Sequence, residues 1–230
     1  MQPSSLLNRF ERWQERWRDP MLTGLLTMLV LEVFVNIPLS SANISSSPIY
    51  FGAVEFIMIV FAVLVASRNH IAAIAVIISL LVALVAGAMR MENPTMFNIL
   101  LGASSSVIFM LTLGTVILGA VFGAGRVTHH RIQGAIVLYL IIALVFATLY
   151  KILITLIPGA LSPPIVGTDR VVVGPRLLYF SLTTLTTTGY GDIVPVHPLA
   201  RSLASLESVV GQLFPATLLV RIMTLHLREK

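Results

Sequence analysis

The chain has 230 residues, of which 57% are hydrophobic and only 11% are charged, and its mean hydropathy is +0.93. A soluble domain is far less apolar, so the composition indicates an integral membrane protein with little mass outside the bilayer. The net charge of +5 comes from basic residues at the ends of apolar runs, which indicates membrane orientation and argues against nucleic acid as a partner. Cysteine is absent, which excludes disulfides and thiolate metal sites, and no hydrolase, nucleotide or metal motif occurs, so we expect no enzyme.

Residues 1–20 predict an amphipathic helix on the cytosolic side of the membrane interface. Aromatic and apolar residues recur on one helical face, and arginines occupy another. The alternative is a plain cytosolic tail, and the two tryptophans favour the interface. The apolar face is Leu6, Phe10, Trp13 and Trp17, and the arginines are Arg9, Arg12 and Arg16.

Six apolar runs follow, each close to or above the ~20 residues that cross a bilayer as a helix. A signal peptide that ends near Ala42 is an alternative for the first run, but its charged leader is too long. The runs are 21–39, 50–66, 71–88, 98–124, 134–157 and 199–226.

Lysine and arginine in the connecting segments predict the orientation. The N-terminal tail carries four arginines, the first loop has no charge, the fourth loop has Arg126 and Arg131, and the C-terminus has two more basic residues. We therefore expect a plasma or inner membrane protein with both termini in the cytosol. His129 and His130 could form a metal site or a pH sensor, but adjacent histidines in a basic loop are more often merely solvated.

The fourth run lacks the arginine at every third position that marks a voltage sensor. It offers Gly119 and Gly123 instead, a small-xxx-small packing face. We expect residues 21–125 to form a four-helix membrane domain in the position of a voltage sensor, without gating arginines.

A Gly- and Pro-rich segment, 158–175, predicts an extracellular turret loop. Pro175 is suited to the first turn of a helix, and residues 176–186 are too short to span the bilayer. They predict a re-entrant pore helix that includes Thr183 and Thr184, and the negative end of its dipole favours a cation.

The polar stretch 183–195 lies between two apolar runs. Gly189 and Gly191 alternate with Tyr190, and because glycine tolerates positive φ, this run can point successive carbonyls to one side. A dehydrated alkali cation needs such a ring of oxygens in place of its water shell.

The stretch resembles the potassium-channel signature T-x-x-T-x-G-Y-G-D, and with RIQGAIVLYL and RSLASLESVVGQLF the resemblance covers residues 131–226. It is a resemblance to bacterial potassium channels with one pore loop per chain, in a six-span form without a voltage-sensor arginine ladder. The matching residues are Thr184, Thr187, Gly189, Tyr190, Gly191 and Asp192.

The resemblance implies a selectivity filter at Thr187, Thr188, Gly189, Tyr190 and Gly191. Backbone carbonyls of the first four would hold K⁺, with the Thr187 hydroxyl at the inner entrance and Asp192 at the outer mouth. Thr188 stands where valine is usual, so the degree of selectivity stays open.

The resemblance also implies a gating hinge at Gly211 in the last span, with Pro215 one turn further on. The alternative is a small residue for close helix packing. Pro215 removes one helical hydrogen bond and should bend the span.

Five ionisable residues fall within the spans, all in the outer half of the membrane, where such groups usually have partners. We predict that Arg90 pairs with Glu32 or Glu55, and that Lys151 lies close to Glu207. In the alternative, Lys151 reaches the outer headgroups, and Glu207 is protonated or bonded to the pore loop.

The sequence thus predicts an all-α membrane protein with six spans and a pore loop between the fifth and sixth, in which residues 131–230 are the pore domain. One loop per chain requires a homotetramer. The expected function is passive potassium conduction, with lipid and a permeant monovalent cation as partners and no cofactor. The alternatives are a weakly selective cation channel, a non-conducting scaffold, or a transporter, although a transporter would show internal repeats.

Overall fold

The computed structural model describes residues 22–41, 70–92, 95–122, 129–165 and 170–227. Within these ranges, five helices are long and apolar enough to cross a membrane. They coincide with the first, third, fourth, fifth and sixth predicted runs. The segment 1–20 and the second run lie outside the described residues. The five helices are Leu22–Leu39, Ile71–Met89, Met96–Gly119, Arg131–Leu156 and Pro198–Arg221.

The first helix contains one π-helical turn, η1 (Glu32–Asn36), before it ends in α2 (Ile37–Ser41). Across this turn the Asn36 amide donates a hydrogen bond of 2.7 Å to the Glu32 carboxylate. Glu32 therefore has a polar contact on its own helix. The side chains of Glu55 and Arg90 lie outside the description, so the Arg90 pairing stays a prediction.

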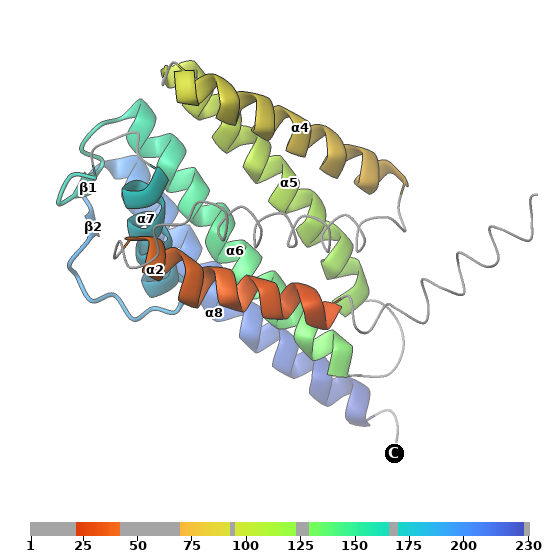
Figure 1. Cartoon of the computed structure of the whole chain (residues 1–230). Coiled ribbons are helices and arrows are strands. Elements are labelled where there is room, and N and C mark those ends of the chain that lie inside the picture. The colour runs from red at the N-terminus through yellow and green to blue at the C-terminus, as the bar shows by residue number, and fades with distance from the viewer. Residues whose placement is uncertain (1–21, 42–69, 93–94, 123–128, 166–169, 228–230) are drawn as a thin grey trace, which may run out of the picture.

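Three long helices pack in sequence order (Figure 1). Helix α4 (His70–Glu92) packs along α5 (Met96–Phe122), and α5 packs along α6 (His129–Leu156). At the α5–α6 contact a β-carbon on Gly134 would lie 2.7 Å from Val121 Cγ2, so a larger residue at this position would require the Val121 side chain to move. Helices α4, α5 and α6 thus pack in sequence order within one chain.

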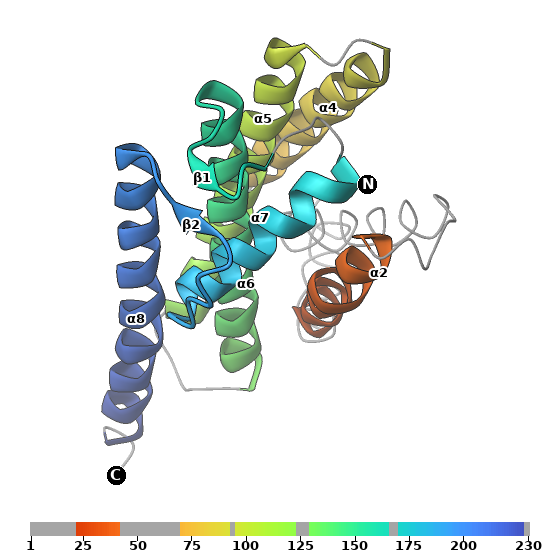
Figure 2. The ribbon, with the colours of Figure 1, turned by 90° about the vertical axis from the view of Figure 1, so that its left-hand side faces the viewer.

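Helix α7 (Arg170–Leu185) lies between α2 and α8 (Pro198–Leu227), which Figure 2 shows at opposite edges. A two-residue strand after α6, β1 (Leu161–Ser162), pairs antiparallel with β2 (Val194–Pro195), with Leu161 opposite Pro195. This ribbon ties the segment before α7 to the segment that leads into α8.

The prediction that Pro175 opens the short helix was wrong, because α7 begins at Arg170 and contains Pro175. Val173 is only 4% exposed and joins the core cluster that contains Leu177. In the second turn, Pro175 removes one backbone hydrogen bond. Burial of Val173 offsets that loss, so packing extends the helix toward its N-terminus.

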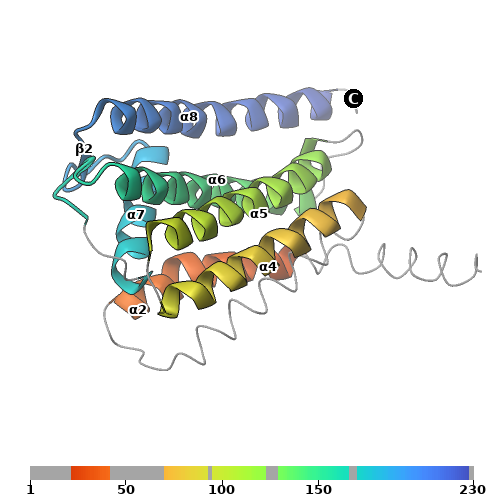
Figure 3. The same cartoon turned by 90° about the horizontal axis from the view of Figure 1, so that it is seen from above.

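Helix α8 is the least covered of the long helices (Figure 3). Only 11% of the most apolar part of α8 is buried, against 50% of the corresponding part of α6. Near its C-terminal end, the Arg221 guanidinium donates a hydrogen bond to the Phe122 carbonyl and lies 5.2 Å from the centre of the Phe122 ring. Large apolar side chains remain exposed along α8, namely Leu199, Leu206, Val209, Leu213, Leu219, Val220 and Met223.

Candidate ion-binding loop

The C-terminal end of α7 leaves its last four backbone carbonyls without partners in the helix. Donors from the following loop, from α6 and from α8 bond to all four. The helix end is therefore fully capped, and Thr183 and Thr184 lie in it as predicted. The pairs are Leu182 O with Thr186 N (3.0 Å) and Thr186 Oγ1 (2.7 Å), Thr183 O with Thr188 N (2.8 Å) and Gly189 N (3.1 Å), Thr184 O with Thr187 N (3.0 Å) and Ser208 Oγ (3.3 Å), and Leu185 O with Tyr139 Oη (3.3 Å).

These bonds also orient the carbonyls of the loop. In a trans peptide the N–H and the C=O point in opposite directions. Because the Thr188 N–H points at α7, the Thr187 carbonyl points away from it. The Gly189 N–H likewise bonds to α7, so the Thr188 carbonyl also points away from the helix. Two successive carbonyl oxygens are thereby turned from α7 toward the other side of the loop.

The backbone alternates in handedness along the same residues. φ is +56° at Thr187, +53° at Gly189 and +79° at Gly191, and no other described non-glycine residue has a positive φ. Glycine adopts this region without a steric penalty, whereas Thr187 is strained there by roughly 1–2 kcal/mol. Such alternation is the geometry in which successive carbonyls can line one side of a chain.

The threonine side chains bond back to the protein. Gln212 donates its amide N–H to Thr187 Oγ1 at 2.9 Å, which steadies the strained residue. Thr186 and Thr188 place their hydroxyl oxygens 2.8 Å apart. Because the single Thr186 proton goes to the Leu182 carbonyl, Thr188 is the donor in this pair. The hydroxyl that replaces the usual valine is thus bonded to the loop beside α7.

Helix α8 approaches the end of α7 closely at Gly211. A β-carbon on Gly211 would lie 1.9 Å from the Leu185 carbonyl oxygen and 2.8 Å from its carbon. Ser208 and Gln212 lie on the same face of α8, at the spacing of one helical turn. This contact is the close packing that was the alternative to a hinge. Pro215 lies inside α8, which continues as a helix through it, and the hinge itself stays a prediction.

Glu207 is fully buried, at 0% exposure. Its carboxyl group contacts the Tyr150 hydroxyl at 2.7 Å and the Ser181 hydroxyl at 2.5 Å. Ser181 belongs to α7, so these contacts are those of the alternative in which Glu207 bonds to the pore loop. Lys151 follows Tyr150 in α6, and neither of the two carboxyl contacts comes from it. Tyr150, the neutral neighbour of Lys151, contacts the carboxyl group, and the proximity of Lys151 to Glu207 stays a prediction.

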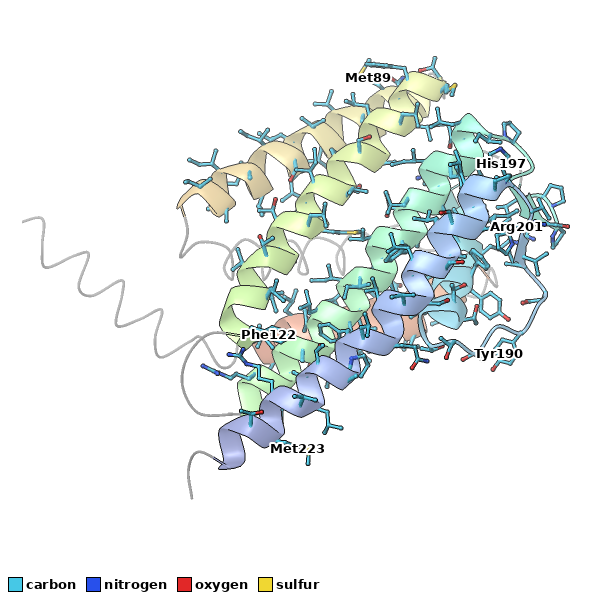
Figure 4. The ribbon with its side chains drawn as sticks, turned by 180° about the vertical axis from the view of Figure 1, so that it is seen from behind. Met89, Phe122, Tyr190, His197, Arg201 and Met223 are labelled. Atoms are coloured by element: carbon cyan, nitrogen blue, oxygen red, sulfur yellow. The ribbon has the colours of Figure 1, made fainter. Side chains whose placement is uncertain are left out.

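At the outer end of the loop, the rings of Tyr179 and Tyr190 stack in parallel, with centroids 6.3 Å apart. Burial raises the pKa of the Tyr179 hydroxyl, and its hydrogen bond to the Asp192 carboxylate raises that pKa further. In Figure 4, Tyr190 lies at the edge of the loop, at the same end of the molecule as His197 and Arg201, and far from Phe122 and Met223. Asp192 is exposed.

Comparison with known proteins agrees with this geometry. Residues 134–227 match the family model described as Ion channel, a segment that takes in most of α6 and all of α7, the loop and α8. No solved structure matches the chain. With the apolar helices, the match supports an ion channel in an α-helical, multi-pass membrane protein. An ion-channel domain also points to a transport protein rather than to an enzyme.

Proposed function

We propose that the protein is a potassium-selective channel that conducts K⁺ passively through a pore built from four copies of the loop 187–191. The observation that carries the proposal is the orientation of the loop. Its N–H groups bond to the end of α7, and its handedness alternates at Thr187, Gly189 and Gly191. Carbonyl oxygens so directed can replace the hydration shell of an alkali cation. The C-terminal end of α7 adds a negative partial charge beside them.

A homotetramer completes this site. One loop contributes a single carbonyl oxygen at each position where an ion would bind, and a closed ring of oxygens requires four such loops. The apolar side chains that α8 leaves exposed are suited to contact neighbouring copies around such an axis. Residues 131–230 would then be the pore domain, residues 21–125 a peripheral membrane domain, and both termini cytosolic by the distribution of basic residues.

Preference for potassium over sodium is supported by the engaged Thr188 hydroxyl. A free hydroxyl at this position could add a ligand to the ion path and weaken the selectivity, but here it donates to Thr186. The weakly selective cation channel remains the nearest alternative, and the non-conducting scaffold or transporter is the alternative of another class.

The test compares two glycines under the same backbone strain. Gly191 in the loop has φ +79° and Gly159 in the turret has φ +81°, and a β-carbon on either meets no atom within 4 Å. Each Gly→Ala change therefore costs the fold a similar amount, about 1–2 kcal/mol. In vesicles loaded with K⁺, Gly191→Ala should abolish flux while the tetramer persists, and Gly159→Ala should conduct normally. Normal conduction by Gly191→Ala would refute the filter assignment, and equal Na⁺ and K⁺ flux in the unmodified protein would favour the weakly selective channel.

A further inference from the structure

The carboxyl group of Glu207 lies at a junction of three helices. Glu207 in α8, Tyr150 in α6 and Ser181 in α7 are each 0% exposed. Tyr150 contacts one carboxyl oxygen and Ser181 the other. Ser181 Oγ also lies 2.8 Å from the backbone carbonyl oxygen of Ala143 in α6.

The protons in this cluster can be counted. A hydroxyl carries one proton, and a backbone carbonyl oxygen only accepts. If Ser181 donates to Ala143, the proton between Ser181 and Glu207 must belong to the carboxyl group. Tyr150 donates its own proton to the second carboxyl oxygen. With Glu207 protonated, each contact holds one proton and no acceptor faces another acceptor.

An ionised Glu207 leaves the cluster one proton short. Ser181 would have to choose between the carboxylate and Ala143, and one contact of 2.5 or 2.8 Å would join two acceptors. A buried carboxylate whose contacts are neutral hydroxyls is costly and tends to take up a proton.

The groups around the carboxyl do not supply a compensating charge through these contacts. From α6, Tyr150 and Tyr139 interact with the carboxyl, and in water such hydroxyls ionise only near pH ~10. Lys151 is the cationic residue next to Tyr150 on this helix, and it makes neither of the two hydrogen-bond contacts to the carboxyl. From α7 the group that contacts it is the Ser181 hydroxyl, and β2 consists of two residues, Val194 and Pro195, that do not titrate.

We propose that Glu207 is a positioning residue that acts as a neutral carboxylic acid, and that its proton fastens α8 to the pore helix α7. Through Ser181 the same chain of hydrogen bonds reaches α6. Because the loop 187–191 is bonded to the end of α7, this proton helps to fix the loop where ions would bind. The functional part of this inference rests on the proposed channel activity, whereas the protonation does not.

Three substitutions separate the neutral acid from an ionised one. In Glu207→Gln, the amide carbonyl can accept from Tyr150 and the amide N–H can donate to Ser181, which reproduces the hydrogen bonds of the acid. Glu207→Asp keeps the acid but is one methylene too short to reach both partners. Ser205→Ala is the control, because Ser205 is an exposed serine of the same helix that bonds only to the Arg201 carbonyl.

The first measurement is the infrared difference spectrum of purified protein against Glu207→Gln at neutral pH. The carbonyl stretch of a protonated carboxylic acid should be present in the unmodified protein, missing in the variant, and lost when the pH is raised. A carboxylate band in its place at neutral pH would overturn the proposal. This readout needs no conduction, so it holds even if the channel activity is refuted.

The second measurement is the ratio of K⁺ to Na⁺ permeability as a function of pH. In the unmodified protein, the ratio should fall at alkaline pH. The fall should be at most roughly fivefold, which is the factor that one net hydrogen bond of ~1 kcal/mol gives if all of its energy discriminates between the two ions. Glu207→Gln and Ser205→Ala should match the unmodified protein at neutral pH. At alkaline pH, the permeability ratio of Glu207→Gln should stay at its neutral-pH value, while that of Ser205→Ala should fall as in the unmodified protein. The permeability ratio of Glu207→Asp should be lowered at every pH. Two results would refute the positioning role. In one, the permeability ratio of Glu207→Gln depends on pH as steeply as that of the unmodified protein. In the other, Glu207→Gln lowers the permeability ratio as much as Glu207→Asp does.

Discussion

Substitution of Gly211 by alanine tests whether this residue is a packing contact or a hinge. The new β-carbon would lie 1.9 Å from the Leu185 carbonyl oxygen, whereas real contacts of this kind stay above 3.0 Å. Helix α8 and the end of α7 would have to separate by about 1 Å, and overpacking of this kind costs about 1–3 kcal/mol. The separation would also stretch the Ser208 bond to α7, worth about 1 kcal/mol. We therefore expect a loss of roughly 2–4 kcal/mol.

The assay has two parts, heat-induced dissociation of the oligomer and the K⁺ to Na⁺ permeability ratio. Gly211→Ala should lower both, because Leu185 lies two residues before the loop that would bind ions. The matched control is Gly119→Ala in α5, since that glycine is also helical and is exposed, and a β-carbon there meets no described atom within 4 Å. The packing face predicted for Gly119 is therefore not used among the described residues of one chain. A hinge that is free of packing would give another result: altered opening with normal stability and selectivity. That outcome would refute the packing argument.

Two further predictions follow from the loop and from the peripheral helices. Thr188→Val removes a hydroxyl bonded to Thr186, which costs about 1 kcal/mol of stability. The K⁺ to Na⁺ permeability ratio should rise or stay unchanged, as measured by reversal potentials with the two ions on opposite sides of the membrane. A clear fall in this ratio would contradict our account of the Thr188 hydroxyl. Since α5 carries no arginine, channel opening should depend only weakly on membrane voltage in patch recordings. Steep opening on depolarisation, in the absence of a blocking ion, would show that another part of the protein carries gating charge.

The long apolar helices could be predicted from the sequence because a membrane span requires a long uninterrupted run of apolar residues, which few other structures require. The glycines of the loop were equally informative, since Gly189 and Gly191 are the positions where the backbone needs positive φ. The start of α7 was mispredicted because proline is a local signal, while burial of Val173 depends on the rest of the fold.

The side chains that hold the loop in place could not be predicted. Tyr139, Ser208 and Gln212 bond to residues that lie 46, 24 and 25 positions away in the sequence. None of them is charged, and each is an ordinary polar residue in an apolar helix until the packing brings it to α7 or to the loop that follows it. Glu207 was singled out for its charge, but its contacts are neutral hydroxyls, which no pattern of charges predicts.

The structure explains why so many polar groups gather at this point of an otherwise apolar chain. A helix that ends among other helices leaves four carbonyls that water cannot reach freely, and each must find a donor. Here the loop gives its own N–H groups to three of them, and this turns its carbonyls away from α7. Tyr139 supplies the bond to the fourth. Capping α7 and turning the carbonyls of the loop away from it are thus one arrangement of the backbone. A change that disturbs the cap should therefore disturb the proposed ion site, even where it touches no residue of the loop.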